Sequence, residues 1–342
     1  MENVFYLSSW SKESPQGGIY TYSLREKCLT QLGFAPLQMA GYLCFSPGGN
    51  ILYATGGVEG REGVAAFAVN DDASLTFLNF VPSFGKSTCH NCVAPNGKFL
   101  YTANYTSGDL TEFTLAPDGT LSGRNKVVAH TGCGPVKGRQ ESAHPHYVSI
   151  TPDGNFLAAA DLGIDKIVAY PFDPDAGIDE TSPVESPMPS GCGPRHILFA
   201  PGNTAYLLTE LGNTILSLHY RAGRFSVIDE ISLLPENCVC DTKAAAIRMS
   251  ADGRFLAGTN RGFDAIALIE VDGKGGMKKV QTTLSGGSSP REANFLPDGR
   301  SFAAANEFSD NIYFFDFDFQ KGTLAPNGLK LEHLRPLCIT WR

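Results

Sequence analysis

The sequence lacks the features that mark several large classes of protein. No window approaches about 18 uninterrupted apolar residues, so no membrane-spanning helix is predicted. The first residues lack a basic segment followed by an apolar core, as a signal peptide would have, and we expect a cytoplasmic protein. No run of Lys and Arg stands out and the formal net charge is -8, so we expect neither a nucleic-acid nor a membrane partner.

Motifs of several enzyme classes are also missing. There is no GxSxG nucleophile elbow, no P-loop and no GxGxxG after a predicted strand, which leaves serine hydrolases, nucleotide hydrolases and dinucleotide-binding enzymes without support. Nine scattered cysteines are an odd number and favour reduced thiols. Neither the pair Cys89 and Cys92 nor the pair Cys238 and Cys240 is joined by a second CxxC, so we expect buried apolar thiols and no metal site.

The sequence is rich in short apolar runs separated by turns, with 37 glycines and 21 prolines. Residues 144–172 contain an alternating apolar run, a Pro-Asp-Gly turn at Pro152, a second run and a third from Lys166 to Phe172, which predicts three strands joined by tight turns. Related copies of this unit begin at Leu43, Cys92, Leu198, Arg248 and Asn294. The chain is therefore a repeat array.

The turn proline, or the alanine that replaces it, gives the period of the array. It stands at Pro47, Pro95, Pro152, Pro201, Ala251 and Pro297. The spacings are 48, 57, 49, 50 and 46 residues. A period of this size, made of short strands without a helical pattern, predicts an all-β propeller with one blade per repeat. The Gly-His and Trp-Asp marks of WD40 repeats are absent.

The two ends of the chain account for one further blade. Residues 4–24 have the pattern of the second and third strands of a blade without its first strand, and residues 335–342 have the pattern of a lone first strand. Pairing them would remove two exposed sheet edges. The sequence therefore predicts one domain over residues 1–342, a seven-bladed β-propeller whose last blade is closed by strands from both termini.

The longest interval, between Pro95 and Pro152, contains a polar, glycine-rich insertion at residues 130–146. It is too long for a hairpin loop. Two interpretations remain open: a functional loop over one end of the propeller, or a disordered segment.

Superposing the repeats on the turn residue predicts which side chains share one rim of the ring. In a hairpin, the start of the first strand lies beside the end of the second. The first strands begin with polar residues at His146, Arg195 and Arg291, and one place later at His90 and His196. The second strands end on Asn104, Asp161, Glu210, Asn260 and Asn306, with Tyr105, Arg261 and Glu307 one place later.

Polar side chains at one mouth of an otherwise apolar channel predict a small-molecule site. Asn and Asp at strand ends also cap turns, and that alternative carries equal weight for Asn104 and Asp161. Three arginines beside Glu210 and His146 point to an anionic substrate, because guanidinium groups bind carboxylate or phosphate and stabilise an oxyanion. Either Glu210 or His146 is then the candidate acid or base.

The blocks HPHYVSITPDGNFLAAADLG, GPRHILFAP, LLTELGNTI, TNRG and PREANFLPDGR resemble the seven-bladed propeller lactonases. That family includes the bacterial type of 6-phosphogluconolactonase and the fungal 3-carboxy-cis,cis-muconate lactonizing enzyme, and the resemblance covers essentially the whole chain. It implies a catalytic set of His146, Arg195, Glu210 and Arg261, a further recurrent arginine at Arg291, and neither a metal nor an organic cofactor. We expect the substrate-binding residues to be Arg291, Asp161, Asn104, His90 and His196. One departure is Glu292, where many relatives carry His or a small residue.

We therefore expect a cytoplasmic carboxylic ester hydrolase that converts 6-phospho-D-glucono-1,5-lactone to 6-phosphogluconate in the pentose phosphate pathway. Its partner would be a small anionic lactone. Two alternatives stay open. The same residues would serve another sugar lactonase or a carboxymuconate cycloisomerase, and a propeller can also be a non-catalytic module that binds a protein partner.

Overall fold

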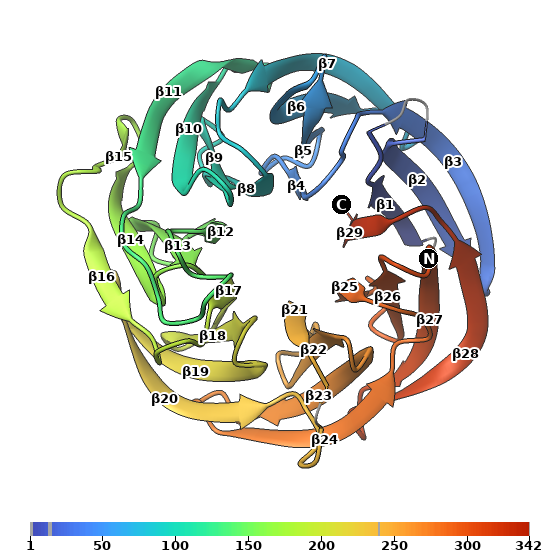
Figure 1. Ribbon diagram of the computed structural model, residues 1–342. Coiled ribbons are helices and arrows are strands. Elements are labelled where there is room, and N and C mark those ends of the chain that lie inside the picture. Colours follow the sequence, from blue (N-terminus) through green and yellow to red (C-terminus); the bar gives the residue numbers. More distant parts are fainter. Residues whose placement is uncertain (1–2, 13–15, 239, 342) are drawn as a thin grey trace.

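The computed structural model describes residues 3–12, 16–238 and 240–341. These residues form seven β-sheets arranged as blades around a common axis (Figure 1), which confirms the predicted seven-bladed β-propeller. Residues 1–2, 13–15, 239 and 342 belong to the predicted domain but lie outside the described residues. In the part of the chain that the structure describes, no helix has the length and apolar character needed to cross a membrane.

Each blade is an antiparallel sheet in which consecutive strands run outward from the axis. Blade 1 contains β4 (Leu43–Phe45), β5 (Ile51–Val58), β6 (Arg61–Val69) and β7 (Leu75–Pro82). Blade 2 contains β8 (Thr88–Val93), β9 (Phe99–Asn104), β10 (Asp109–Leu115) and β11 (Leu121–Ala129). Blade 3 contains β12 (Pro145–Ile150), β13 (Phe156–Asp161), β14 (Lys166–Asp173), β15 (Gly177–Ile178) and β16 (Val184–Pro187).

The remaining blades repeat this order. Blade 4 contains β17 (Pro194–Ala200), β18 (Thr204–Thr209), β19 (Thr214–Arg221) and β20 (Arg224–Ser232). Blade 5 contains β21 (Lys243–Met249), β22 (Phe255–Arg261), β23 (Ala265–Val271) and β24 (Met277–Leu284). Blade 6 contains β25 (Pro290–Phe295), β26 (Ser301–Asn306), β27 (Asn311–Asp318) and β28 (Thr323–Glu332). Blade 7 contains β29 (Pro336–Thr340), β1 (Asn3–Ser9), β2 (Gly18–Arg25) and β3 (Cys28–Pro36).

The recurrent Pro-Asp-Gly sequence is explained by the turn between the first two strands of a blade. In blade 3, Gly154 N donates to Thr151 O at 2.9 Å, and the Asp153 carboxylate accepts a hydrogen bond from Thr151 Oγ1 at 2.6 Å. Gly154 has a φ of 71°, a left-handed conformation that favours glycine. The turn therefore requires a glycine at this place, which is why the marker is legible in the sequence.

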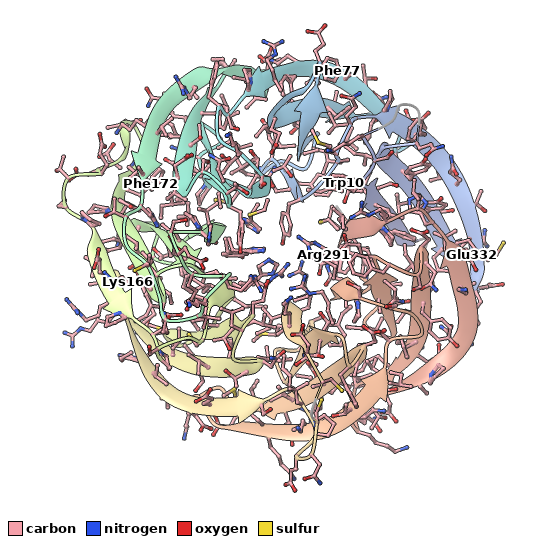
Figure 2. All side chains as sticks on the ribbon, in the orientation of Figure 1. Trp10, Phe77, Lys166, Phe172, Arg291 and Glu332 are labelled. Carbon is pink, nitrogen blue, oxygen red and sulfur yellow. The ribbon has the colours of Figure 1, made fainter. Side chains whose placement is uncertain are left out.

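Seven apolar clusters fill the seven interfaces between neighbouring blades. Small residues of the second strands, such as Ala158 and Ala160, are fully buried there against the next blade. Figure 2 shows side chains filling the space between sheets, with Trp10 and Arg291 near the axis and Phe77 and Glu332 on the outer wall. This packing holds the innermost strands in fixed positions around the axis.

The last blade is closed by strands from both ends of the chain, as predicted. Strand β29 pairs antiparallel with β1, and Ile339 lies opposite Leu7. Ile339 is 1% exposed and packs with Phe5, Leu7 and Leu296 at the interface between blades 6 and 7. The C-terminal strand therefore both covers the edge of β1 and completes the ring.

Replacing Ile339 with Ala is expected to lower the free energy of unfolding by about 2–5 kcal/mol, because it removes buried methyl groups from the closing interface. Urea unfolding followed by tryptophan fluorescence measures the change. Thr340→Ala in the same strand, at a half-buried position, is the matched control. An unfolding midpoint equal to that of the wild type for Ile339→Ala would contradict the role given to β29.

Candidate active site

The side chains at the mouth are delivered by a β-bulge that recurs at the start of the innermost strands. The pairing register with the second strand shifts at the second residue of β8, β12, β17 and β25. The bulged residues are Cys89, His146, Arg195 and Arg291. A bulge re-aims the extra side chain, and bulges are common beside active sites. The position six residues before each turn marker is therefore a structural position that points into the mouth.

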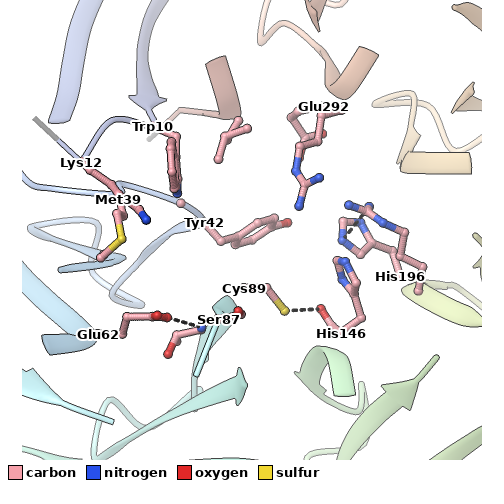
Figure 3. Close-up of a pocket in the computed structure, with 16 residues that line it drawn as sticks. Trp10, Lys12, Met39, Tyr42, Glu62, Ser87, Cys89, His146, His196 and Glu292 are labelled. Carbon is pink, nitrogen blue, oxygen red and sulfur yellow. Dashed lines mark hydrogen bonds between the residues drawn. The ribbon is translucent and has the colours of Figure 1, made fainter. Parts of the chain in front are cut away.

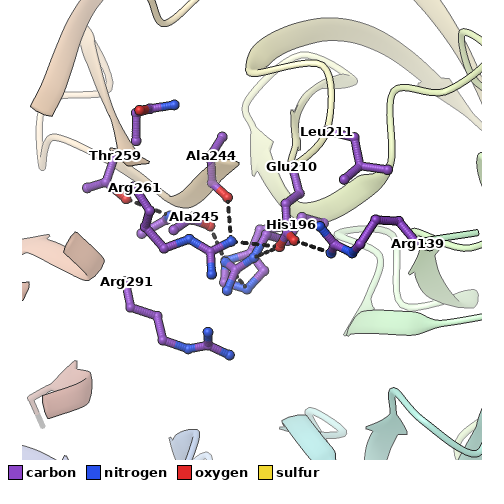
Figure 4. Close-up of polar contacts among 12 residues, drawn as sticks. Arg139, His196, Glu210, Leu211, Ala244, Ala245, Thr259, Arg261 and Arg291 are labelled. Atoms are coloured by element: carbon purple, nitrogen blue, oxygen red, sulfur yellow. Dashed lines mark hydrogen bonds and ion pairs between the residues drawn. The ribbon is translucent and has the colours of Figure 1, made fainter. Parts of the chain in front are cut away.

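Glu210 follows β18 directly and is the hub of the cluster. Its Oε2 atom accepts from Arg195 Nε at 2.9 Å and pairs with Arg261 Nη2 at 2.9 Å. Its Oε1 atom accepts from Arg139 Nη2 at 2.5 Å. Figure 4 shows Arg139 approaching the carboxylate from the side opposite Arg261. One carboxylate thus holds three guanidinium groups.

The cluster is buried, and its charges control its protonation. Burial alone would raise the pKa of Glu210, but the charges of Arg261 and Arg195 outweigh burial and hold that pKa far below its usual range. Burial and the neighbouring charge of Arg261 lower the pKa of Arg195 to about 9. At neutral pH the carboxylate is therefore ionised and Arg195 remains charged.

The guanidinium group of Arg195 is held by three partners. Besides Glu210, it donates through Nη1 to the backbone oxygen of Ala245 and contacts His196 Nε2 at 3.2 Å. Because arginine only donates, His196 Nε2 must be the acceptor. Arg261 Nη2 donates to Ala244 O at 3.1 Å. The start of β21 therefore orients both arginines.

His146 lies beside this cluster as a neutral imidazole. Burial and the charge of Arg195 lower its pKa well below the ordinary histidine value. Its ring is 5.5 Å from that of His196 and 5.8 Å from that of Tyr105, centre to centre, and its buried Nδ1 atom has no hydrogen-bond partner among the described residues. The Cys89 thiol donates to His146 O at 3.6 Å. His146 therefore adds a neutral, buried imidazole to the cluster.

The cluster opens into a cavity with two adjoining lobes. One lobe, of about 320 Å³, is lined by Ser87, Cys89, Tyr105, Arg139, His146, Glu210, Lys243, Arg261 and Arg291. The other, of about 370 Å³, shares Ser87, Cys89, His146 and Arg291 with it and extends to Trp10, Tyr42, Glu62, His196 and Glu292 (Figure 3). The two lobes leave room for a phosphorylated monosaccharide or a molecule of similar size.

The structure brings together most of the residues predicted for the site. The predicted catalytic residues Arg195, Glu210 and Arg261 are in direct contact, and His146 and Arg291 line the same cavity. Their catalytic roles remain predictions.

Asn104 and Asp161 do not reach the cavity, because strand-end turns engage their side chains. Asn104 Nδ2 donates to Asp109 Oδ1 at 2.6 Å, and Asp161 accepts from the backbone nitrogens of His144 and Gly163 at 2.8 and 2.9 Å. The bond from Gly163 N is the turn-capping alternative, whereas the bond from His144 N joins Asp161 to the insertion.

The two histidines expected to bind substrate lie deeper, against the aromatic residues of the axis. The His90 ring lies 3.9 Å from that of Tyr42 and 4.0 Å from that of Tyr147, centre to centre. Its Nδ1 accepts from Val148 N at 3.4 Å. His196 lines the second lobe beside Arg195.

Sequence reasoning missed Arg139, which the insertion carries to Glu210. The segment between β11 and β12 has a defined path, so the structure supports a loop over the mouth and contradicts a disordered segment. Gln140 is fully buried and donates to Leu162 O at 2.7 Å and to Asp165 Oδ1 at 2.8 Å. The only signal in the sequence was the length of the insertion. No repeat position predicts Arg139, because the other blades have no counterpart of this loop.

Two further carboxylates at the mouth are neutralised by arginines of their own. Glu292 Oε2 accepts from Arg248 Nη2 at 2.6 Å, so its charge is balanced by Arg248. Glu307 pairs with Arg335 at 2.8 Å and more loosely with Arg291 at 3.6 Å. The departure at Glu292 is therefore an internal ion pair.

Cys89 and Cys92 both pack against the apolar cluster between blades 2 and 3, and Cys89 also lines the cavity. Within residues 3–12, 16–238 and 240–341, no three His, Cys, Asp or Glu side chains are placed so that they could hold a metal ion.

Comparison with known proteins places the chain in a family. A family model described as "Lactonase, 7-bladed beta-propeller" matches residues 4–341. The 6-phosphogluconolactonase of Bacillus subtilis is 35% identical to this chain, over 98% of the chain and 97% of that protein. The periplasmic gluconolactonase of Pseudomonas aeruginosa has a TM-score of 0.93 and 27% identity, covering 99% of both chains.

A solved structure of a protein from Lactobacillus plantarum has a TM-score of 0.91 and 31% identity, and also covers 99% of both chains. These likenesses extend from the first blade to the closing strand, and the expected family is confirmed. The chain belongs to the seven-bladed β-propeller lactonases.

Proposed function

We propose that the protein hydrolyses 6-phospho-D-glucono-1,5-lactone to 6-phosphogluconate. Lactone hydrolysis follows from membership of the family, and the phosphorylated substrate is supported by the 35% identical Bacillus subtilis relative. The observation that carries the proposal is the Glu210 cluster, a buried carboxylate held by Arg139, Arg195 and Arg261 at the wall of a cavity. A base and several oxyanion donors are what ester hydrolysis requires.

In the proposed reaction, a water molecule attacks the lactone carbonyl carbon while Glu210 takes a proton from it. The carbonyl oxygen becomes an oxyanion, which Arg195 or Arg261 stabilises by donated hydrogen bonds. The bond between the carbonyl carbon and the ring oxygen then breaks, and the ring oxygen takes the proton back to become a hydroxyl group. The new carboxyl group belongs to the same molecule and loses its remaining proton to solvent, so the single product is a hydroxy carboxylate and Glu210 is again ionised. The neutral His146 lines the same lobe and is placed to orient the water.

The charge of the first lobe fits an anionic substrate. The first lobe is lined by Arg139, Arg261, Arg291 and Lys243, whereas Glu210 is its one carboxylate among the described lining residues. A surplus of guanidinium groups favours phosphate, which arginine binds bidentately.

The pH dependence follows from the lowered pKa values of both candidate bases. A base acts in its deprotonated form, which dominates above its pKa, and the pKa values of Glu210 and His146 lie below their usual values. We therefore expect kcat, corrected for spontaneous hydrolysis, to stay constant from about pH 5.5 to about pH 7.5. A fall in kcat with a midpoint near pH 6.5, the value of an unperturbed histidine, would contradict these environments.

A second candidate substrate is the unphosphorylated glucono-1,5-lactone. It is favoured by the likeness to the Pseudomonas aeruginosa protein, which is named a gluconolactonase. The same catalytic residues would serve both substrates. That relative is also named as periplasmic, so our proposal of a cytoplasmic location and of a role in the pentose phosphate pathway needs its own test by cell fractionation.

The proposal is tested by kcat/KM for the two lactones, measured by acid release in weakly buffered solution. We expect the phosphorylated lactone to be preferred. A preference for gluconolactone would replace the proposed substrate, and a rate equal to the spontaneous rate with both would overturn the proposal. A carboxymuconolactone serves as a third substrate, since the arginines would also bind its carboxylates.

A further inference from the structure

We propose that Arg139 senses the phosphate of the substrate: it leaves Glu210 for the phosphate when a phosphorylated lactone binds, and so frees the Oε1 atom of Glu210 to act as base. This inference rests on the proposed function and assigns a specificity-determining role to the loop between β11 and β12. The resting cluster and the active cluster would then differ by one exchanged ion pair.

The three arginines on Glu210 are not equivalent. Arg195 and Arg261 share Oε2, belong to strands, and have side chains 3% and 16% exposed. Arg139 alone holds Oε1, comes from a loop, and is 26% exposed. Both strand arginines also donate to backbone oxygens at the start of β21, at Ala245 and Ala244. Arg139 is therefore the arginine that can change partner without disturbing a strand.

Arg139 also has donors left over for a ligand. Its Nη2 atom donates to Glu210 and, at 3.4 Å, to the Tyr105 hydroxyl, while its Nη1 atom is buried without a partner in the described structure. A buried guanidinium nitrogen without an acceptor is costly. A phosphate in the first lobe would satisfy it, because arginine presents two parallel donors to phosphate oxygens.

The loop is anchored on both sides of Arg139, so the exchange requires movement of a side chain and not of the whole loop. On one side, His130 Nδ1 lies 2.7 Å from Asp161 Oδ2. On the other, the Gln140 amide is held by Leu162 O and Asp165. These contacts keep the backbone of Arg139 beside the cavity in either state.

The exchange matters because Arg139 occupies Oε1, the oxygen of Glu210 that neither strand arginine holds. Burial raises the pKa of Glu210, but the charges of Arg261 and Arg195 hold it low, and the hydrogen bond from Arg139 adds to them. A phosphate dianion attracts Arg139 away from Oε1, which leaves that oxygen open to water. An unphosphorylated lactone offers Arg139 no anion, so Glu210 would remain clamped. Selectivity for the phosphate would then appear in kcat as well as in KM.

A different role for Arg139 would be a permanent clamp that only fixes the loop on Glu210. The two roles differ in substrate dependence. A clamp affects both lactones equally when it is removed, whereas a phosphate sensor affects mainly the phosphorylated one.

The experiment compares Arg139→Gln, Arg139→Lys and wild type with 6-phosphogluconolactone and gluconolactone. Lys137→Gln is the matched control, because Lys137 lies in the same loop, is exposed, and has no ion pair or hydrogen bond within the described residues. For Arg139→Gln we expect the ratio of kcat/KM for the phosphorylated over the plain lactone to fall about tenfold to a hundredfold. We expect kcat for the plain lactone to rise, since Oε1 is freed. Arg139→Lys keeps the charge but not the paired donors and should fall between.

Calorimetric binding of the products 6-phosphogluconate and gluconate gives a second readout. The tighter binding of 6-phosphogluconate should be lost in Arg139→Gln and kept in Lys137→Gln. An equal loss of rate with both lactones, or an unchanged preference for 6-phosphogluconate, would overturn the inference while leaving the lactonase proposal intact. A wild type that hydrolyses neither lactone would overturn both.

Discussion

Replacing Glu210 with Gln is expected to reduce kcat for lactone hydrolysis by a factor of about 10² to 10⁴. Gln keeps the size of the side chain and one oxygen acceptor, but it cannot take a proton from the attacking water. It also leaves Arg139, Arg195 and Arg261 without their shared counter-charge. The loss should appear mainly in kcat, measured by acid release under saturating lactone.

Folding must be measured alongside, because the cluster is buried. Removal of one partner from a buried ion pair costs about 3–5 kcal/mol of stability. Glu210 belongs to none of the seven apolar clusters between the blades, so the circular dichroism spectrum should still be that of a folded β-propeller. A folded Glu210→Gln protein with the kcat of the wild type would exclude Glu210 as the base and leave His146 as the candidate.

The second large effect is expected for Arg195→Ala, which should lower kcat/KM by about 10² to 10³ through loss of an oxyanion donor. Arg195 is the most buried of the three arginines and is fixed by Glu210, His196 and the backbone oxygen of Ala245. The variant should also lower the unfolding midpoint, since Glu210 loses one of its two strand arginines. Arg221→Ala is the matched control, because Arg221 is exposed on β19 of the same blade.

If Arg195→Ala and Arg261→Ala each retained near-normal kcat/KM, the oxyanion would have to be stabilised by other groups. Arg291 would be examined next, as it lines both lobes of the cavity. The proposed pairing of Glu210 as base with strand arginines as donors would then be wrong.

The blades could be predicted from sequence because each is a local unit. A turn that needs glycine after an aspartate, as at Gly154, leaves the same short signature in successive repeats. The two ends of the chain gave the seventh blade. The C-terminal segment has the pattern of a lone first strand, the N-terminal segment lacks a first strand, and pairing the two makes one complete blade. Strand β29 beside β1 is that pair.

The site could be predicted from sequence only where its residues occupy equivalent positions in the repeats. The bulge at the start of the innermost strands occupies one repeat position, so alignment of the repeats found His146, Arg195 and Arg291 together. The same alignment included Asn104 and Asp161, which occupy equivalent strand ends but are hydrogen-bonded to other groups, Asn104 to Asp109 and Asp161 to its own turn and to the insertion. The position of a residue in the repeat predicts the rim of the propeller on which its side chain lies, but not its hydrogen-bond partner.

What sequence could not give is contact made across the repeats. Arg139 reaches Glu210 from a loop 71 residues earlier in the chain, and no periodic pattern carries such a pair. The ion pair of Arg248 with Glu292 joins β21 to β25, and the sequence did not predict it either. The sequence showed that Glu292 is unusual, but only the structure shows that Arg248 balances its charge.

The most direct test of the account is the consumption of freshly prepared 6-phosphoglucono-1,5-lactone by purified wild type and Glu210→Gln, each measured against spontaneous hydrolysis. The account predicts that the wild type exceeds the spontaneous rate by orders of magnitude and that the variant, prepared identically, falls close to it. A wild type that does not exceed the spontaneous rate, or a folded variant as fast as the wild type, would contradict it.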